Sequence, residues 1–309
     1  MITTVTLNAA IDKTYYVDRF ELGKVTRVPK MHALPGGKGI NVARVIHLLG
    51  ESSLATGFIA GSNGRFIEKK LTEQGISHDF VTIEGESRIC LNIIDRSSGE
   101  STEILEQGPT AAQMDQTAME AKVKELAERS GILCFSGSLL AGVPTDFYAR
   151  LIATAKSAGA KVFLDTSGDA LLAGIEAVPY FIKPNEDEVA KIIGHPLEKE
   201  SDLYDSVQGL MERGIACVVV SLGENGSLAG VEGQLYRVKA PRIEAVNTVG
   251  CGDSFVAGMA VGVARGLPVE ECLRLATASG SANALTEEAG NVRLDDVQRL
   301  IAEVSIELL

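Results

Sequence analysis

The segment NTVGCGDSFVAG, residues 247–258, combines residue types that a phosphoryl-transfer site needs. Gly250 and Gly252 bracket Cys251, and Asp253 follows directly before an apolar run. A glycine turn that opens a helix leaves free backbone N–H groups at the positive end of the helix dipole, and these bind anions. Cys251 is small enough to leave that backbone accessible. Asp253 could act as a general base that takes a hydroxyl proton as the oxygen attacks phosphorus. Aspartate is also a favoured helix N-cap, so this segment alone leaves both interpretations open.

The segment PGGKGINVA, residues 35–43, is a second candidate anion site. Lys38 and Asn41 could contact a substrate, and three glycines would let the backbone approach it: Gly36, Gly37 and Gly39. An ordinary helix start with a solvated lysine is the alternative interpretation.

Neither glycine segment fits a common nucleotide-binding motif. Gly39 follows Lys38 where a Walker A loop requires Ser or Thr. Phe255 stands where a dinucleotide fingerprint requires its third glycine, and that segment lies late in the chain. The sequence therefore disfavours a Walker-type nucleotide hydrolase and a Rossmann-type oxidoreductase.

A metal site is suggested by KPNEDEV, residues 183–189. Asn185 and Glu188 lie three positions apart at the start of a predicted helix, where they could hold Mg²⁺ directly or through water. An acidic first helical turn is also common without any metal, because it complements the helix dipole.

These residues must be positioned by the elements around them. From residue 131 onward, the β-branched runs GILCFSG, AKVFLDT, YFIKPN and ACVVVSLG alternate with helical patterns. This alternation predicts an α/β fold with a doubly wound, mostly parallel sheet flanked by helices. Polar side chains follow the strands in five places: Asn8 and Asp12; Ser136 and Ser138; Asp165 and Ser167; Lys183 and Asn185; Ser221 and Glu224. Since ligands of such sheets bind outside the carboxyl ends of the strands, we expect these loops to share one crevice.

Two segments interrupt the alternation of strands and helices. Residues 13–32 and 87–107 each have the pattern of a strand pair with no helix between the strands, the second with a turn at 97–99. They predict a small β-sheet that serves as a lid or as an oligomer interface. Because no repeat or linker divides the chain, residues 1–309 are predicted to form a single domain with this lid inserted.

Composition excludes several other classes. The chain has 29 basic and 41 acidic residues, a net charge of −12 and no tryptophan, which disfavours a nucleic-acid binder. Five scattered cysteines without a CxxC pair argue against disulfides and structural zinc, and indicate a reducing compartment, so we expect a cytoplasmic protein. No apolar run reaches the length that spans a membrane.

Taken together, the sequence resembles the ribokinase-like (PfkB) family of carbohydrate kinases over essentially its whole length. GGKGINVA is similar to the family's N-terminal signature, NTVGCGDSFVAG to its C-terminal signature, and Asn185–Glu188 to its NxxE pattern. TLNAAID, SGSLLAG and ESTEILEQGP resemble the branch of tagatose-6-phosphate kinases and 1-phosphofructokinases. The chain departs from that branch at Ala9 and Leu140, where proline is usual, and at Cys251, where alanine or serine is usual.

The resemblance implies transfer from ATP with Mg²⁺, with Asp253 as the base and the amides of residues 250–252 as an anion hole. It implies that Asp12 and Asn41 hold the sugar, and Ser136 is assigned to the same site. The nucleotide site would be lined by Lys183, Asn185, Ser221, Gly223 and Gly226, and Asn283 would lie near the purine base of the nucleotide. A phosphosugar would be held by the positive charges of Lys38, Arg88 and, from the lid, Arg27.

The expected function is therefore phosphorylation of a ketohexose monophosphate to its 1,6-bisphosphate. Tagatose 6-phosphate and fructose 1-phosphate both remain open, because both need similar anion chemistry. The alternatives are a kinase for an unphosphorylated sugar or nucleoside, and a sugar-phosphate sensor without catalysis. We expect small-molecule partners only, with neither nucleic acid nor membrane, and a homodimer formed through the lid.

Overall fold

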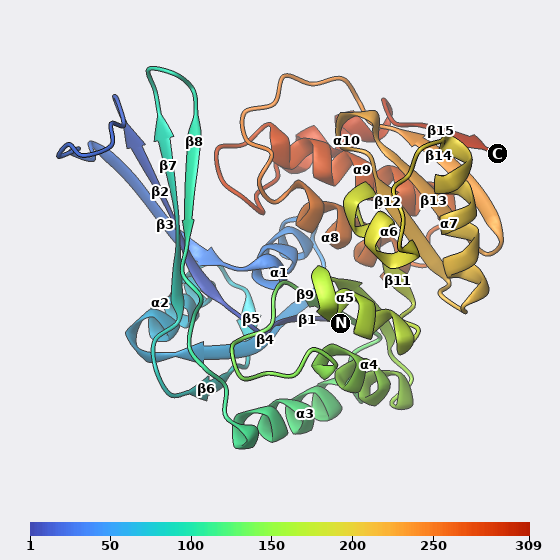
Figure 1. The fold of residues 1–309 in the computed structure, drawn as a ribbon, viewed down its shortest axis with the longest axis horizontal. Coiled ribbons are helices and arrows are strands. Elements are labelled where there is room, and N and C mark those ends of the chain that lie inside the picture. The colour runs from blue at the N-terminus through green and yellow to red at the C-terminus, as the bar shows by residue number, and fades with distance from the viewer.

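A mixed β-sheet of eleven strands runs through the larger part of the molecule (Figure 1). In the computed structural model, which describes residues 1–309, the strand order is β15-β14-β13-β12-β11-β10-β9-β1-β4-β5, and β6 pairs with β4. Strands from β12 to β5 are parallel, while β13, β14 and β15 form an antiparallel edge. The strands are β1 (Ile2–Thr6), β4 (Ser53–Ala60), β5 (Ser77–His78), β6 (Val81–Ile83), β9 (Ile132–Ser136), β10 (Lys161–Asp165), β11 (Phe181–Ile182), β12 (Cys217–Ser221), β13 (Ser227–Val231), β14 (Gln234–Lys239) and β15 (Ser305–Leu308).

Helices cover both faces of this sheet. Along β12, Cys217 and Val219 belong to the core on one face, and Val218 and Val220 belong to the core on the other. The first core includes side chains from α1 (Lys38–Leu48), α8 (Cys251–Ala264), α9 (Val269–Ala284) and α10 (Leu294–Ile301). The second includes side chains from α3 (Gln113–Ala127), α4 (Phe147–Ser157), α5 (Gly168–Glu176), α6 (Glu186–Ile193) and α7 (Glu200–Glu212). The predicted doubly wound, mostly parallel sheet is thus confirmed.

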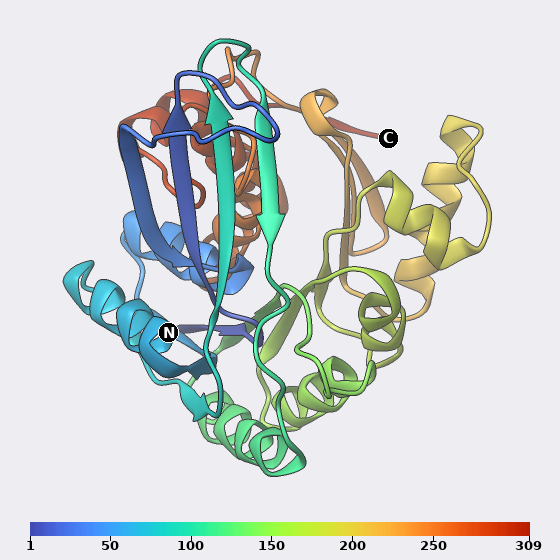
Figure 2. The ribbon, with the colours of Figure 1, turned by 60° about the vertical axis from the view of Figure 1, so that its left-hand side comes forward.

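A second sheet of four strands stands apart from the main sheet (Figures 1 and 2). Its order is β3-β2-β7-β8, built from β2 (Ala10–Val17), β3 (Lys30–Gly36), β7 (Arg88–Asp95) and β8 (Ser101–Leu105). The helix α2 (Gly61–Glu73) packs beside it and beside β4. We call this sheet the lid. Its strand β3 extends beyond the predicted limit at residue 32, because Gly36 pairs with Ala10 in register, so the lid leads directly into the glycine segment before α1.

The helices α8 and α9 pack closely against each other. A Cβ atom on Gly258 would lie 2.7 Å from the Cα atom of Ala276, and one on Gly262 would lie 2.8 Å from the Sγ atom of Cys272. Real Cβ atoms essentially never approach another heavy atom so closely, so a side chain at either position would force α8 away from α9. The position of the N-terminus of α8 is therefore rigidly defined.

None of the ten helices combines the length and the apolar character that crossing a bilayer requires.

Candidate active site

The glycine turn at the start of α8 presents backbone amides to the crevice between the lid and the main sheet. Gly250 is the N-cap with φ of 84°, and a Cβ there would lie 2.6 Å from the amide nitrogen of Gly290, so this position needs glycine. The amide groups of Gly252 and Asp253 donate to no acceptor within the protein. Free amides at the N-terminus of a helix form an anion site.

Two cavities meet at this turn. The smaller, of about 330 Å³, is bounded by the lid and α1 and reaches Gly250, Gly252 and Asp253. The larger, of about 860 Å³, lies over β12 and α9 and reaches Cys251 and Gly252. Gly252 therefore lines both, and a group transferred from one cavity to the other would pass its amide.

Asp253 faces the smaller cavity as a nearly buried carboxylate, 5% exposed. Its Oδ2 atom accepts a hydrogen bond of 2.9 Å from Nδ2 of Asn41. Burial is the main cause that raises the pKa of Asp253 to about 6, and the negative charge of Asp165 raises it further. The positive charges of Lys38 and Lys183 and the hydrogen bond from Asn41 act in the opposite direction. A carboxylate with such a pKa is ionised at neutral pH and is more basic than an exposed one, as a general base requires.

Two lysines flank the turn and share one buried carboxylate. The Nζ atoms of Lys38 and Lys183 lie 3.3 Å and 3.5 Å from the two oxygens of Asp165. Burial opposes ionisation of Asp165, but Lys183 and Lys38 outweigh it and hold the pKa of this carboxyl below its usual range. Lys38 lines the smaller cavity and Lys183 lines the larger one. The sequence placed Asp165 at the end of a strand but gave it no role, because only the fold shows that it joins both lysines.

The smaller cavity contains most of the residues expected to bind substrate. Asp12, Gly37, Lys38, Asn41 and Arg88 all line it. Asp12 packs against Gly36, where any Cβ would overlap its carboxyl group. Burial raises the pKa of Asp12, although Arg44 and Arg88 oppose this. Arg88 is oriented by donating to the carbonyl oxygens of residues 8 and 106, at 3.3 Å and 3.5 Å.

The larger cavity contains most of the residues expected to bind nucleotide. Lys183, Ser221, Gly223 and Gly226 line it. Asn283, expected near the base, lines neither cavity: it is fully buried, and its Oδ1 atom accepts from Ser254 and from the amide of Gly290. It holds the turn from behind, and its side chain does not reach the larger cavity.

Two further expected substrate contacts lie outside the smaller cavity. Ser136 is fully buried at the end of β9, and Arg27 lies in the loop between β2 and β3, away from both cavities of this chain. The pattern of polar residues after strands does not predict which of them are buried, so it gave no sign that Ser136 is buried while Ser138 is exposed.

Asn185 and Glu188 form a reciprocal capping box at the start of α6. Oδ1 of Asn185 accepts from the amide of Glu188 at 2.8 Å, and Oε2 of Glu188 accepts from the amide of Asn185 at 2.9 Å. Asn185 lines neither cavity. The Oε1 atom of Glu188 has no partner in the protein. The negative charge of Asp165 is the main cause that raises the pKa of Lys38, and the charges of Asp253 and Glu188 add to it. One oxygen of Glu188 is thus free, and Glu188, like Asn185, lines neither cavity.

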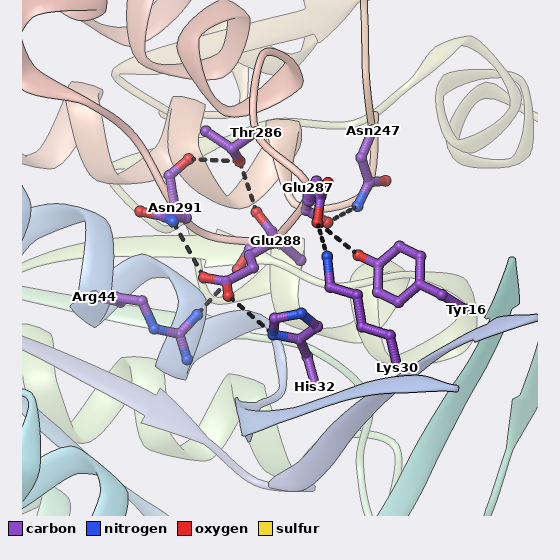
Figure 3. Close-up of polar contacts among 10 residues, drawn as sticks. Tyr16, Lys30, His32, Arg44, Asn247, Thr286, Glu287, Glu288 and Asn291 are labelled. Carbon is purple, nitrogen blue, oxygen red and sulfur yellow. Dashed lines mark hydrogen bonds and ion pairs between the residues drawn. The ribbon is translucent and has the colours of Figure 1, made fainter. Parts of the chain in front are cut away.

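The loop of residues 285–291 joins the turn to the lid (Figure 3). Glu287 accepts from Oη of Tyr16 at 3.2 Å and lies 3.0 Å from Nζ of Lys30, and both of these residues belong to the lid. Nδ1 of His32 lies 3.7 Å from Oε1 of Glu288. The lid is therefore held against the same loop that packs on Gly250.

Comparison with known proteins gives consistent similarities. A family model described as pfkB family carbohydrate kinase matches residues 5–296. The chain is 35% identical to the tagatose-6-phosphate kinase of Staphylococcus epidermidis, over 99% of each protein.

Solved structures of similar fold include phosphofructokinase-2 from Escherichia coli in complex with fructose-6-phosphate, with a TM-score of 0.91 and 29% identity over 97% of this chain and 98% of that one. They also include a protein from Thermotoga maritima described as a possible 1-phosphofructokinase, with a TM-score of 0.91 and 27% identity over 100% and 99%.

Proposed function

Because the chain belongs to the pfkB family of carbohydrate kinases, we propose that it transfers the terminal phosphoryl group of ATP to a ketohexose monophosphate, forming a 1,6-bisphosphate. The observation that carries this proposal is the meeting of two cavities at Gly252, with Asp253 on one side and Lys183 on the other. Tagatose 6-phosphate is the favoured substrate, since the relative at 35% identity is a tagatose-6-phosphate kinase. Fructose 1-phosphate is the other candidate.

In this mechanism the sugar occupies the smaller cavity and ATP the larger. Asp253 accepts the proton of the sugar hydroxyl, whose oxygen forms a bond to the γ-phosphorus as the bond to the β–γ bridging oxygen breaks. The free amides of Gly252 and Asp253, together with Lys183 and Lys38, hold the negative charge on the phosphoryl group as it passes. Phosphoryl transfer depends mainly on such positioning and charge stabilisation.

The phosphate of the sugar requires positive charge at the far side of the smaller cavity. Arg88 meets this requirement, because backbone contacts orient its guanidinium at the cavity wall beside Asp12. A guanidinium can hold a phosphate through two parallel hydrogen bonds. A neutral sugar would leave this charge without a partner.

Mg²⁺ fits the residues beside the turn. Mg²⁺ keeps several waters and uses one or two carboxylates together with substrate phosphates, so a dedicated cage of acidic residues is unnecessary. The structure has no such cage, but it offers the unpartnered Oε1 atom of Glu188, whose negative charge acts on Lys38. Bound there through water, the ion would neutralise charge on the nucleotide phosphates.

A homodimer formed through the lid is part of the proposal. Large apolar side chains of the lid and its connecting loop are exposed, with Leu22 at 91% and Val25 at 89%. Two lids packed together would cover these residues and would bring Arg27 of one protomer near the sugar phosphate of the other. Charge replacement at Leu22 and Val25 should yield monomers by light scattering, and Arg27→Ala should raise KM for the phosphosugar.

The substrate assignment is tested by measuring ADP release with tagatose 6-phosphate, fructose 1-phosphate, fructose 6-phosphate, ribose and adenosine. We expect the highest kcat/KM with a ketohexose monophosphate. Arg88→Ala should raise KM for that substrate by at least about tenfold while leaving KM for ATP unchanged, since a charged hydrogen bond contributes about 1.5–3 kcal/mol. A higher kcat/KM with ribose or adenosine would refute the assignment, and binding without ADP release would indicate a sensor.

A further inference from the structure

The guanidinium of Arg44 is a buried cation beside the catalytic carboxylate. Arg44 lies on α1, three residues after Asn41, so both side chains project from one face of the helix. The residue is only 6% exposed, and buried arginines normally require several partners. The sequence gives no sign of this burial, because the residue type and the position of Arg44 in its segment would suit a solvated arginine equally well.

Arg44 connects three segments that surround the smaller cavity. Its Nη1 atom donates to Oδ1 of Asn41 at 3.1 Å and to the carbonyl oxygen of Ala289 at 3.0 Å, and Nη2 donates to the carbonyl of Pro35. Figure 3 shows the guanidinium directed at the 285–291 loop. Pro35 precedes the glycines that face Asp12, and Ala289 precedes the glycine that packs on Gly250. One side chain therefore ties α1 to both edges of the site.

The contact with Asn41 determines which way that amide points. An arginine has only donors, so the atom of Asn41 that faces Arg44 must be the oxygen. The amide nitrogen must then face Asp253, where it makes the 2.9 Å hydrogen bond to Oδ2. If the amide were reversed, its oxygen would face a carboxylate oxygen, and the two would repel unless Asp253 carried a proton.

We propose that Arg44 is a positioning residue for the phosphoryl transfer, which acts by holding the Asn41 amide so that it donates to the ionised carboxylate of Asp253. This inference rests on the proposed role of Asp253 as the base. Arg44 acts through Asn41 and needs no contact of its own with the reacting atoms.

The charges around Asp253 make the inference measurable through pH. Asp253 is faced by Lys38 and Arg44 from α1, by Lys183 from the segment before α6, and by Asp165 from the end of β10. The Asn41 hydrogen bond favours the ionised form of Asp253. Loss of that hydrogen bond would raise the pKa of Asp253, so the acid limb of kcat/KM would move to higher pH.

The test compares Arg44→Gln, Arg44→Lys and the control Gln74→Ala. Oε1 of Gln74 lies 3.5 Å from Nε of Arg44 and does not touch Asn41, so Gln74→Ala perturbs the same guanidinium without affecting the amide. We expect Arg44→Gln to lower kcat by about tenfold to a hundredfold, as displacement of a catalytic group does, and Gln74→Ala to leave it unchanged. In the profile of kcat/KM against pH, the acid limb of Arg44→Gln should lie about one pH unit higher than that of the wild-type protein.

Arg44→Lys retains the charge but cannot donate to three acceptors in the same geometry. It should therefore still show the shifted acid limb, whereas a purely electrostatic role would be restored by lysine. If thermal unfolding shows that Arg44→Gln does not fold, the pH profile of Arg44→Lys alone still tests the inference.

A double-mutant cycle separates positioning from general support of the structure. In an Asn41→Ala background, Arg44→Gln should change kcat/KM by no more than about twofold, since residues that act through each other are not additive. Full additivity, or an unmoved acid limb in both Arg44 variants, would overturn the inference. Failure of the proposed base would look different, because Asp253→Asn would then keep normal ADP release.

Discussion

Replacing Asp253 by asparagine should weaken catalysis and strengthen the fold at the same time. Asparagine is nearly isosteric with aspartate, and its Oδ1 atom can still accept the hydrogen bond from Nδ2 of Asn41. The substitution removes the negative charge that a general base needs. We therefore expect kcat to fall by about two to four orders of magnitude.

The gain in stability follows from burial of the carboxylate. Burial raises the pKa of Asp253 from 3.8 to about 6, a difference of about two units, which corresponds to about 3 kcal/mol. Because the folded-state pKa lies above the unfolded-state value, the stabilising contribution of protonated Asp253 is fully present below about pH 3.8 and is lost as the pH rises through about 6. At neutral pH the wild-type protein therefore carries an unfavourable buried charge that Asp253→Asn lacks.

The assay is denaturant unfolding of the wild-type and Asp253→Asn proteins without ligands, combined with ADP release. The difference in free energy of unfolding should approach about 3 kcal/mol near pH 8 and shrink towards zero near pH 4. A variant that is less stable than wild type at every pH would refute the reasoning about burial. Normal turnover in that variant would refute the role of Asp253 as base.

Three further predictions follow from the same geometry. The kcat/KM of the wild-type protein should fall about tenfold per pH unit below pH 6, because Asp253 must be ionised, and a profile that stays flat to about pH 5 would contradict this. Gly252→Ala should fold, since its Cβ would meet only the flexible Nζ atom of Lys183 at 3.2 Å, but should lower kcat by about 10²–10³-fold by obstructing the amides. Gly258→Ala should instead act mainly on stability, lowering the free energy of unfolding by about 1–3 kcal/mol, because its Cβ would lie 2.7 Å from the Cα atom of Ala276. Its kcat should fall less than that of Gly252→Ala, because Gly258 lines neither cavity. Glu188→Gln should keep the capping bond to Asn185 and raise the Mg²⁺ concentration for half-maximal ADP release by about tenfold or more, whereas an unchanged requirement would exclude Glu188 from the metal site.

The sequence predicted the fold through features that depend on local chemistry. Apolar strands such as CVVVS are typical of a sheet that helices cover on both faces, and β12 is such a strand, parallel to β11 and antiparallel to β13. The strand pairs of the lid were also predictable, because two successive strands joined without a helix pair antiparallel with each other, as β2 does with β3 and β7 with β8. The glycine turn was predictable too, because Gly250 and Gly252 directly before an apolar run indicate a turn that opens a helix, and α8 begins there.

The sequence was less informative where a role depends on distant neighbours. Asp165 matters because two lysines converge on it, and Arg44 because residues from three segments accept its hydrogen bonds. The burial of the Asn283 side chain was equally hidden, because residue type does not show whether an asparagine on a helix faces a cavity or the interior. Such assignments require the three-dimensional contacts, since residue type and spacing are the same in either case.

The hydrogen bond between Asn41 and Asp253 spans 212 residues, and that between Lys30 and Glu287 spans 257. Contacts between such distant segments form late, because the chain must lose the entropy of a long loop before it gains them. During synthesis, β2 and α1, which carry Asp12 and Asn41, emerge long before α8 does. An incomplete chain therefore holds part of the smaller cavity without the amides of the glycine turn, so we expect no phosphoryl transfer before α8 has docked.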